Sequence, residues 1–253
     1  MRLFDDINKL PNYSVGIADS DDEIKEAQIL RYKMLLCEFD NTKSEDGIDK
    51  NEYDDVCEHL IVKDNLNNKI IGTYRLLTNI KYGKNTKFLC ESEFDVDKLK
   101  NSGKNILELS RAVVHRDYRN GIVIKLLWQG IFYYCKKYDI RYLFGTASFH
   151  GLDYTKFSHS LSYIYYNYMV DESLMCYAKE PCINFNIFKK EEIDEKLAKA
   201  ETQPLIKGYF SLGCKVGTGL FFDREFNSSD LMMILDMTKI NKKYAERMFG
   251  VQI

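Results

Sequence analysis

Residues 105–149 decide the fold class, and they read NILELSRAVVHRDYRNGIVIKLLWQGIFYYCKKYDIRYLFGTASF. The opening NILELSRAVV is typical of a strand, and the basic loop HRDYRN follows it. From Gly121 onward, the dense apolar positions predict a helix that packs on a sheet. The closing IRYLFGTASF predicts another strand. The order strand, loop, helix, strand favours an α/β fold with a mixed sheet.

The flanking segments extend this pattern in both directions. From Asp21, acidic residues precede apolar residues at helical spacing, which predicts an amphipathic helix that contains Arg31. Residues 59–77 predict two strands joined by an Asn-rich turn, with Arg75 on the second strand. Further helices and short strands are expected toward the C-terminus, among them a tyrosine-rich helix over 155–169. Because we find no internal repeat and no linker, we expect a single domain over residues 1–253.

The composition narrows the class of protein. The chain has 253 residues, 45% hydrophobic and 29% charged, with only 14 Gly and 3 Pro, so it reads as an ordinary globular protein with a sizeable core. Its 36 basic and 38 acidic residues give a net charge of -2, which offers no electrostatic footprint for nucleic acid. We therefore predict no nucleic-acid partner, while a local basic patch that faces an acidic partner stays open.

The spacing of the cysteines and histidines narrows the class of protein further. The seven cysteines include no C-x-x-C pair, which fits neither a disulfide framework nor a zinc site. A reducing, cytoplasmic compartment is the simplest expectation. Because His115, His150 and His159 lack metal-ligand spacing, we predict no metal. No eighteen apolar residues follow one another, so any membrane contact is expected to be peripheral.

The candidate site begins on the strand that carries Glu108 and Arg111 and continues into the basic loop. A helix start with N–H groups and a flanking arginine suits a phosphate group. The alternative is a plain turn with surface arginines, and the residues alone do not choose between the two. The phosphate interpretation selects Arg116, Arg119, Asn120, Gly121 and Ile122.

The same segment resembles the acyl-donor loop of the GNAT N-acyltransferase superfamily. More narrowly, four separated blocks resemble the ornithine N-acyltransferases that start ornithine-lipid synthesis, and the likeness runs over most of residues 24–250. The blocks are CEHLIVKD, ELSRAVVHRDYRNG, LFGTASFHGLD and LIKGYFSLGCKVGTGLFFDREFNSSD.

This resemblance implies a GNAT fold, in which a mixed central sheet flanked by helices splays open to admit a phosphopantetheine arm. The N–H groups of Val113 and Val114 are expected to bind that arm or the thioester oxygen. It implies transfer of a fatty acyl group, typically 3-hydroxyacyl, from acyl carrier protein to the α-amino group of ornithine, with acyl-CoA as the alternative donor and no bound cofactor. Where the family tends to have two glycines, Asn120 precedes Gly121 here, so the loop is less suited to a pyrophosphate.

The blocks YDDVCEHLIV, GTYRLL and ELSR also resemble the acyl-homoserine-lactone synthases, a GNAT branch with carrier-protein donors. Quorum-signal synthesis is therefore an alternative function. The likeness implies site roles for Asp54, Arg75, Glu108 and Arg111, with Arg31 as a weaker candidate.

Amide formation needs an uncharged amine, so a base must accept a proton from the protonated acceptor. We expect Glu108 to be this base, and Arg75 or Arg111 to clamp the acceptor's carboxylate. The structural alternative is an ion pair between Glu108 and an arginine. We expect an acidic carrier protein to dock on basic residues such as Arg116, Arg119 and Lys125.

HLIVKD also matches the H-x-x-x-x-D dyad of glycerolipid O-acyltransferases. Five strand steps of about 3.3 Å would place His59 and Asp64 roughly 16 Å apart on opposite faces, which argues against a dyad and leaves His59 as a lone site residue or a structural one. A non-catalytic module that binds the carrier or a membrane is a third hypothesis. Asp223 and Asp230, with Arg224, either orient the late strands or face the acceptor amine.

Overall fold

A computed structural model describes residues 1–4, 10–37 and 46–251. The chain divides into two compact units. The first unit comprises Met1–Thr78, Leu107–Ile140 and Ala245–Ile253, and the second comprises Asn79–Ile106 and Arg141–Tyr244. The expectation of a single domain over 1–253 stays a prediction.

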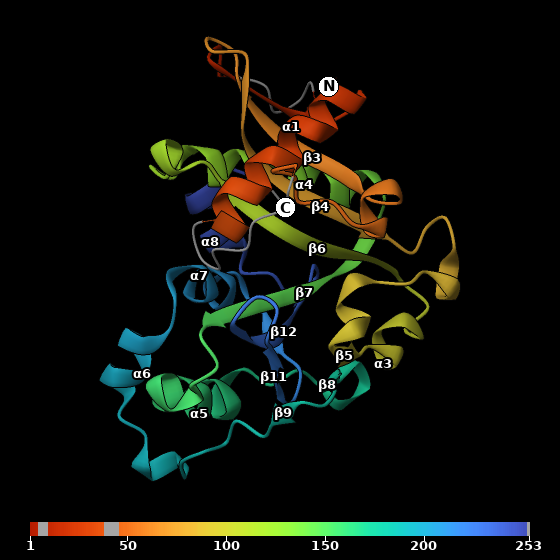
Figure 1. The fold of residues 1–253 in the computed structure, drawn as a ribbon. Coiled ribbons are helices and arrows are strands. Elements are labelled where there is room, and N and C mark those ends of the chain that lie inside the picture. Colours follow the sequence, from red (N-terminus) through yellow and green to blue (C-terminus); the bar gives the residue numbers. More distant parts are fainter. Residues whose placement is uncertain (5–9, 38–45, 252–253) are drawn as a thin grey trace. The chain divides into compact units, whose positions relative to one another are not determined.

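The first unit contains an antiparallel sheet (Figure 1). Its strands follow the order β1 (Arg2–Leu3), β2 (Tyr13–Ile17), β3 (Glu58–Asp64), β4 (Lys69–Thr78) and β6 (Asn105–Val114). The helical segments are α1 (Asp21–Arg31), the π-helical η1 (Tyr32–Leu36), the 3-10 helices η2 (Glu52–Asp55) and η5 (Arg116–Tyr118), and α4 (Ile122–Lys137). Helix α8 (Lys242–Phe249) ends in this unit.

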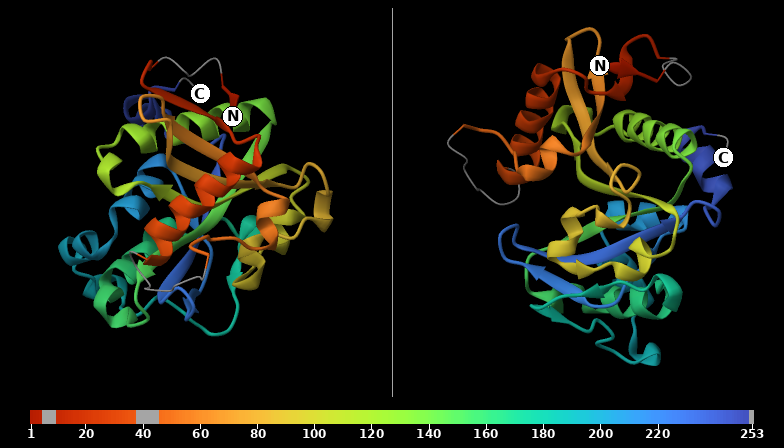
Figure 2. Two further views of the ribbon diagram at one scale, coloured as in Figure 1. Left: turned by 45° about the horizontal axis from the view of Figure 1, so that its top comes forward. Right: turned by 90° about the vertical axis from the view of Figure 1, so that its right-hand side faces the viewer.

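Helices α1 and α4 cover opposite faces of β3 and β4, as the right-hand view of Figure 2 shows. The side chains of a strand contact α1 and α4 alternately, because successive side chains of a pleated strand point to opposite faces. Ile61 packs in one buried cluster with Leu30 of α1, whereas the neighbouring Leu60 lies against Gly130 of α4. Side chains that share a face with Ile61 therefore lie on the α1 side of the sheet.

Within the second unit, the strands pair antiparallel. Strand β12 (Ser228–Asp236) pairs with β7 (Ile140–His150), β11 (Leu220–Asp223) and β10 (Lys215–Val216), and β11 also pairs with β9 (Cys182–Ile183). A separate ribbon joins β5 (Phe94–Asp95) and β8 (Tyr177–Ala178). The helical segments are η3 (Gly83–Asn85), η4 (Leu89–Ser92), α3 (Asp97–Lys100), η6 (Tyr154–Phe157), α5 (Ser158–Tyr168), η7 (Glu172–Leu174), η8 (Lys190–Glu192), α6 (Glu195–Glu201) and α7 (Pro204–Leu212).

Most elements lie where the sequence predicts them. The order β6, loop, α4, β7 confirms the strand, loop, helix, strand prediction, and β3 with β4 confirms the hairpin. The fold is of the mixed α/β class. The splay of the central strands stays a prediction. None of the described helices is both long and apolar enough to cross a bilayer.

Gly72 tests the packing between β4 and α4. A Cβ at this position would lie 2.4 Å from Cγ1 of Val123 and 3.2 Å from Cδ1 of Leu127, so either α4 or the strand must shift. We expect Gly72→Ala to lower the free energy of unfolding by about 1–3 kcal/mol, measured by denaturant titration. Gly208→Ala on α7 is the control, because its Cβ would meet only Tyr244 at 3.9 Å. An unchanged stability for Gly72→Ala would contradict this packing.

Candidate active site

Polar residues cross the α1 face of the first unit's sheet in one row. His59 on β3 lies opposite Arg75 on β4, and Arg75 lies opposite Ser110 on β6. Directly paired residues share a face, so all three point toward the α1 side. Arg75 Nε donates to Ser110 Oγ at 3.3 Å. The hairpin of β3 and β4 and the more distant strand β6 thus contribute to one polar site.

Asp54 joins this row to helix α1. Its Oδ1 accepts from Nη2 of Arg31 at 2.7 Å and from Nε2 of Gln28 at 3.2 Å, and its Oδ2 accepts from Nη1 of Arg75 at 3.0 Å. A capping box holds the carboxylate in place, because Asn51 and Asp54 bond reciprocally at the start of η2. Arg31, Arg75 and Asp54 are 0%, 1% and 5% exposed, so this is a buried bridge between two guanidinium groups.

Asp49 extends the network to a third arginine. Its Oδ2 accepts from Nε of Arg31 at 2.8 Å and from Nε of Arg111 at 3.1 Å, and its backbone oxygen accepts from Arg31 as well. Two carboxylates therefore bridge three arginines. The sequence prediction included Arg31, Asp54, Arg75 and Arg111 but missed Asp49 and Ser110, whose signal is only their position in the fold.

Arg111 reaches Asp49 because β6 contains a bulge. The register of β6 against β4 shifts between Thr73 and Arg75, so β6 accommodates one extra residue there. Arg111 has φ +54°, the left-handed region that a non-glycine residue rarely occupies. Such a conformation costs on the order of 1–3 kcal/mol and persists where the surroundings hold it, here the ion pair with Asp49. The bulge thereby turns Arg111 toward the network.

Burial and the neighbouring charges shift the pKa values of Asp54 and Arg75. Burial alone would raise the pKa of Asp54, but the charge of Arg31 and the bonds around it outweigh burial, so its pKa is lowered. Burial lowers the pKa of Arg75, and the like charge of Arg111 adds to this effect. The nearby Asp54 opposes both effects on Arg75, as expected for a carboxylate that accepts a hydrogen bond from it.

His59 is part of the network in its neutral form. Burial lowers its pKa, and the charge of Arg31 acts in the same direction. Because a guanidinium only donates, Nδ1 of His59 accepts from Arg31 at 3.4 Å, and Nε2 therefore carries the proton that faces the backbone oxygen of Asp54 at 3.3 Å. Both ring nitrogens are engaged within the protein, which favours a positioning role over that of a base.

Glu108 lies two residues before Ser110 on β6 and shares its face of the sheet. It is 2% exposed. Glu108 and Arg75 both act on the thiol of the neighbouring Cys57. Burial raises the pKa of this thiol to about 12, the charge of Arg75 lowers it, and the charge of Glu108 raises it further. Glu108 therefore stands on the same face as the arginine network, on the strand that carries Ser110.

Arg75 keeps one donor for a ligand. Its Nε and Nη1 bond to Ser110, Asn51 and Asp54, but within the described residues its buried Nη2 has no hydrogen-bond partner. Buried guanidinium N–H groups are rarely left unsatisfied. Nη2 is thus the atom of the network best suited to bind an anionic group from outside the chain.

The predicted phosphate loop joins β6 to α4 in the same unit. Val113 and Val114 end β6 opposite Thr73 and Gly72, and Arg116 lies in η5. Arg119 donates from Nε to the backbone oxygen of Val114 at 3.2 Å. Gly121 caps α4 with φ +92°, a conformation that favours glycine, and Asn120 Oδ1 accepts from the N–H of Ile122 at 3.1 Å. Asn120 therefore occupies one helix-start donor that a phosphate would otherwise use.

Exposed basic side chains gather around this loop. Burial lowers the pKa of His115, and the positive charges of Lys69, Arg116 and Lys33 lower it further, with Asp117 opposing them. Lys69 Nζ lies 3.2 Å from Nε2 of His115. Arg119 and Lys125 are also exposed. The loop is thus flanked by a basic patch, consisting of Lys33, Lys69, Arg116, Arg119 and Lys125, that suits an acidic partner.

Comparison with known proteins places the chain among acyltransferases. Residues 30–129 match the acetyltransferase (GNAT) domain family. The chain is 31% identical to the L-ornithine N(alpha)-acyltransferase of Rhodobacter capsulatus, with 93% of this chain and 94% of the relative covered. It is 32% identical to the enzyme of the same name from Brucella abortus, with 94% and 89% covered.

Solved structures share the fold at lower sequence identity. An N-acyl amino acid synthase from uncultured soil microbes matches with a TM-score of 0.51 at 11% identity, over 91% of this chain and 93% of the other. The AHL synthase LasI matches with a TM-score of 0.50 at 13% identity, over 95% and 96%. At these identities the likeness shows the fold alone, and it confirms the GNAT-like class.

The bridge at Asp54 is tested by its removal. Asp54→Asn leaves two buried guanidinium groups without their shared carboxylate, so we expect a loss of about 3–5 kcal/mol in the free energy of unfolding near neutral pH. Asp55→Asn is the matched control, because Asp55 is exposed and faces Lys50 at 3.9 Å, a surface pair worth roughly 0–1 kcal/mol.

The stability lost in Asp54→Asn should become smaller as the pH falls. The folded pKa of Asp54 is lowered from 3.8, so its stabilisation is present above pH 3.8 and is lost as pH falls through the folded value. Urea titrations at several pH values should show the wild-type and Asp54→Asn curves converging below about pH 4. A difference that is constant from pH 7 to pH 3 would show that the carboxylate charge is not responsible.

Proposed function

The chain belongs to the family of the L-ornithine N(alpha)-acyltransferases, and from this premise we propose that it transfers a fatty acyl group, typically 3-hydroxyacyl, from acyl carrier protein to the α-amino group of ornithine. This reaction is the first step of an aminolipid pathway. The single observation that carries the proposal is the buried arginine network beside Glu108, which combines an anion-binding donor with a carboxylate on the same face of the sheet. The sequence relatives favour ornithine over the lactone alternative.

In the proposed reaction, the uncharged α-amine attacks the thioester carbonyl. The new amide C–N bond forms as the C–S bond breaks, and the phosphopantetheine thiol leaves. The acceptor's ammonium group loses one proton before the attack and a second proton after the C–N bond has formed. Glu108 accepts one of them, directly or through water, and one proton ends on the departing sulfur. No acyl group becomes attached to the protein.

The acceptor's α-carboxylate is assigned to Nη2 of Arg75. This donor is buried, so the carboxylate gains a charge-assisted hydrogen bond in a site of low dielectric. Holding the carboxylate fixes the adjacent amino group. Arg111 lies close enough to influence the pKa of Arg75 and is the second candidate for the clamp.

The loop supports a carrier protein as donor. With Asn120 bonded to the N–H of Ile122, the start of α4 offers fewer donors for a pyrophosphate, whereas a carrier-linked arm has one phosphodiester. The basic patch also matches the acidic surface that a carrier protein presents. We place the reaction in the cytoplasm, with peripheral membrane contact for an aminolipid product.

Glu108→Gln tests the base. We expect its kcat to fall on the order of a hundredfold or more, because the amide cannot accept the proton, while the affinity for the acyl carrier protein stays nearly unchanged. Turnover is measured by thiol release, and a melting curve checks the fold. Glu91→Gln is the control, since this carboxylate pairs with Lys100 in the second unit. Full activity of Glu108→Gln across pH would remove Glu108 from the mechanism.

The donor is tested by parallel assays with 3-hydroxyacyl carrier protein and the matching acyl-CoA. We expect a higher kcat/KM with the carrier protein, and a KM that rises with salt, because screening weakens the attraction to the basic patch. Arg116→Glu with Arg119→Glu should raise the KM for the carrier protein, whereas Lys207→Glu, an exposed reversal on α7, should not. A clear preference for acetyl-CoA would reject the proposed donor.

A further inference from the structure

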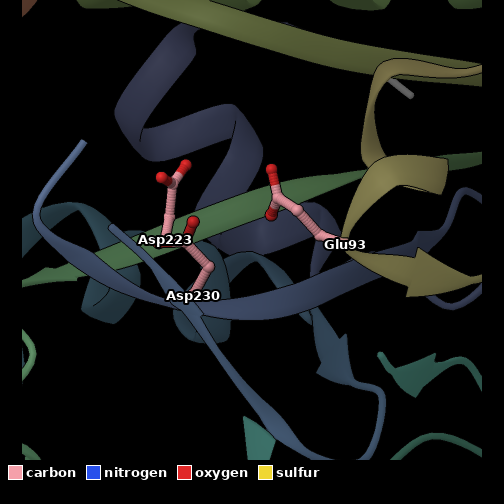
Figure 3. A group of neighbouring side chains, drawn as sticks. All are labelled: Glu93, Asp223 and Asp230. Carbon is pink, nitrogen blue, oxygen red and sulfur yellow. The ribbon is translucent and has the colours of Figure 1, made fainter. Parts of the chain in front are cut away.

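Three carboxylates of the second unit lie together, those of Glu93, Asp223 and Asp230 (Figure 3). Asp230 is hydrogen-bonded to Ser148, Ser228 and Glu93. The bond with Glu93 needs a proton on one of the two carboxyl groups, and burial raises the pKa of Asp230 to about 6. Two backbone N–H groups donate to Asp223. Groups of the chain itself thus stabilise this cluster, and we assign it no ligand.

In the first unit, the turn between β3 and β4 carries an exposed leucine. Leu66 is 77% exposed, the highest value of any large apolar side chain in the described ranges. Its neighbours Asn65, Asn67 and Asn68 are polar and exposed, as is usual in a hairpin turn. Because single exposed leucines are common on protein surfaces, the meaning of Leu66 depends on how it is held and on what surrounds it.

Asp64 holds the turn in place. Its Oδ1 accepts from the N–H of Leu66 at 2.9 Å and from that of Asn67 at 3.3 Å, and its Oδ2 accepts from Nδ2 of Asn67 at 2.7 Å. The hydroxyl of Tyr118 in η5 donates to the same Oδ2 at 2.7 Å. The bonds from Tyr118 and Asn67 lower the pKa of Asp64, which is therefore ionised near neutral pH. The turn is thus fastened to the loop between β6 and α4, and Leu66 is positioned before any partner binds.

The turn is continuous with the basic patch. Lys69 begins β4 three residues after Leu66, and its Nζ lies 3.2 Å from Nε2 of His115. The ring of His115 meets the ring of Tyr118 edge-on, with centroids 5.6 Å apart. Arg116 follows His115 directly and is exposed. An unbroken series of contacts therefore joins the exposed leucine to the exposed cations, all within the first unit.

We propose that Leu66 and the basic patch form one docking surface for the acyl carrier protein, with Leu66 as its apolar anchor. The inference rests on the proposed function for its choice of partner. The basic patch matches the acidic surface of a carrier protein, which favours encounter and orientation. Burial of Leu66 adds affinity that does not depend on charge, and little order remains to be gained because Asp64 already holds the turn.

An anionic membrane suits this surface less well than a folded partner does. Asp117 is 73% exposed beside Arg116, and a continuous sheet of anionic headgroups would repel it. A bilayer also binds a face of several apolar side chains, whereas the turn offers Leu66 among asparagines. A carrier protein can place its acidic groups opposite the cations, leave Asp117 outside the contact and enclose one leucine.

The test measures the Kd of the protein for 3-hydroxyacyl carrier protein. We expect Leu66→Ala to raise this Kd roughly fivefold to thirtyfold, because most of a leucine side chain is no longer buried, and Leu66→Met to keep the wild-type value. The loss in Leu66→Ala should persist at high salt, whereas the loss in Lys69→Glu should shrink as salt screens the charge. Leu205→Ala is the matched control, since Leu205 is a 43% exposed leucine on α7 of the second unit.

Further measurements separate failure of this inference from failure of the proposed function. If the wild-type protein acylates no amino acid but binds the carrier protein more tightly than Leu66→Ala does, the proposed function fails and the docking surface stands. An unchanged Kd in Leu66→Ala would overturn the inference even if ornithine is acylated. Equal loss of kcat/KM with acyl-CoA as donor would also overturn it, because acyl-CoA has no carrier surface to dock. So would binding to phosphatidylglycerol vesicles that depends on Leu66, with the Kd for the carrier protein unchanged.

Discussion

The bridge from Asp54 to Arg31 and Arg75 is the constraint on which the rest of the first unit depends. Two guanidinium groups with almost no exposure must each have an anionic partner, because an unpaired buried charge is far costlier than any single packing contact. One carboxylate serves both. The bridge draws η2 onto the α1 face of the sheet and aligns α1 with β4. Asp49 is the second carboxylate of the network, and it connects Arg111 to Arg31.

The bulge at Arg111 shows how local strain serves this network. A regular strand would turn Arg111 to the face opposite Ser110, away from Asp49. The extra residue in β6 reverses that direction at the cost of a left-handed backbone conformation. The result is a cluster of three arginines in which Nη2 of Arg75 stays available to an anion. Strain, charge and the unsatisfied donor all occur at the position where the acceptor's carboxylate is proposed to bind.

Periodicity was sufficient to predict most of the architecture. The helix after Gly121 and the hairpin after His59 follow from apolar spacing and turn residues, which are local properties of the chain. The bulge was not predictable, because it depends on the register between two strands 35 residues apart. Asp54, Arg75, Glu108 and Arg111 were selected by family resemblance, whereas Asp49 belongs to no motif and is identified only by its contacts with two arginines.

In the proposed reaction, the acyl group passes directly from the carrier thioester to the α-amino nitrogen of ornithine. Because ornithine has two amines, tandem mass spectrometry of the product is the most direct measurement. We expect a product with its acyl group on the α-nitrogen and a free side-chain amine, together with unmodified protein in the same reaction. An acyl group on the side-chain nitrogen, or an acylated protein that forms and decays with turnover, would contradict it.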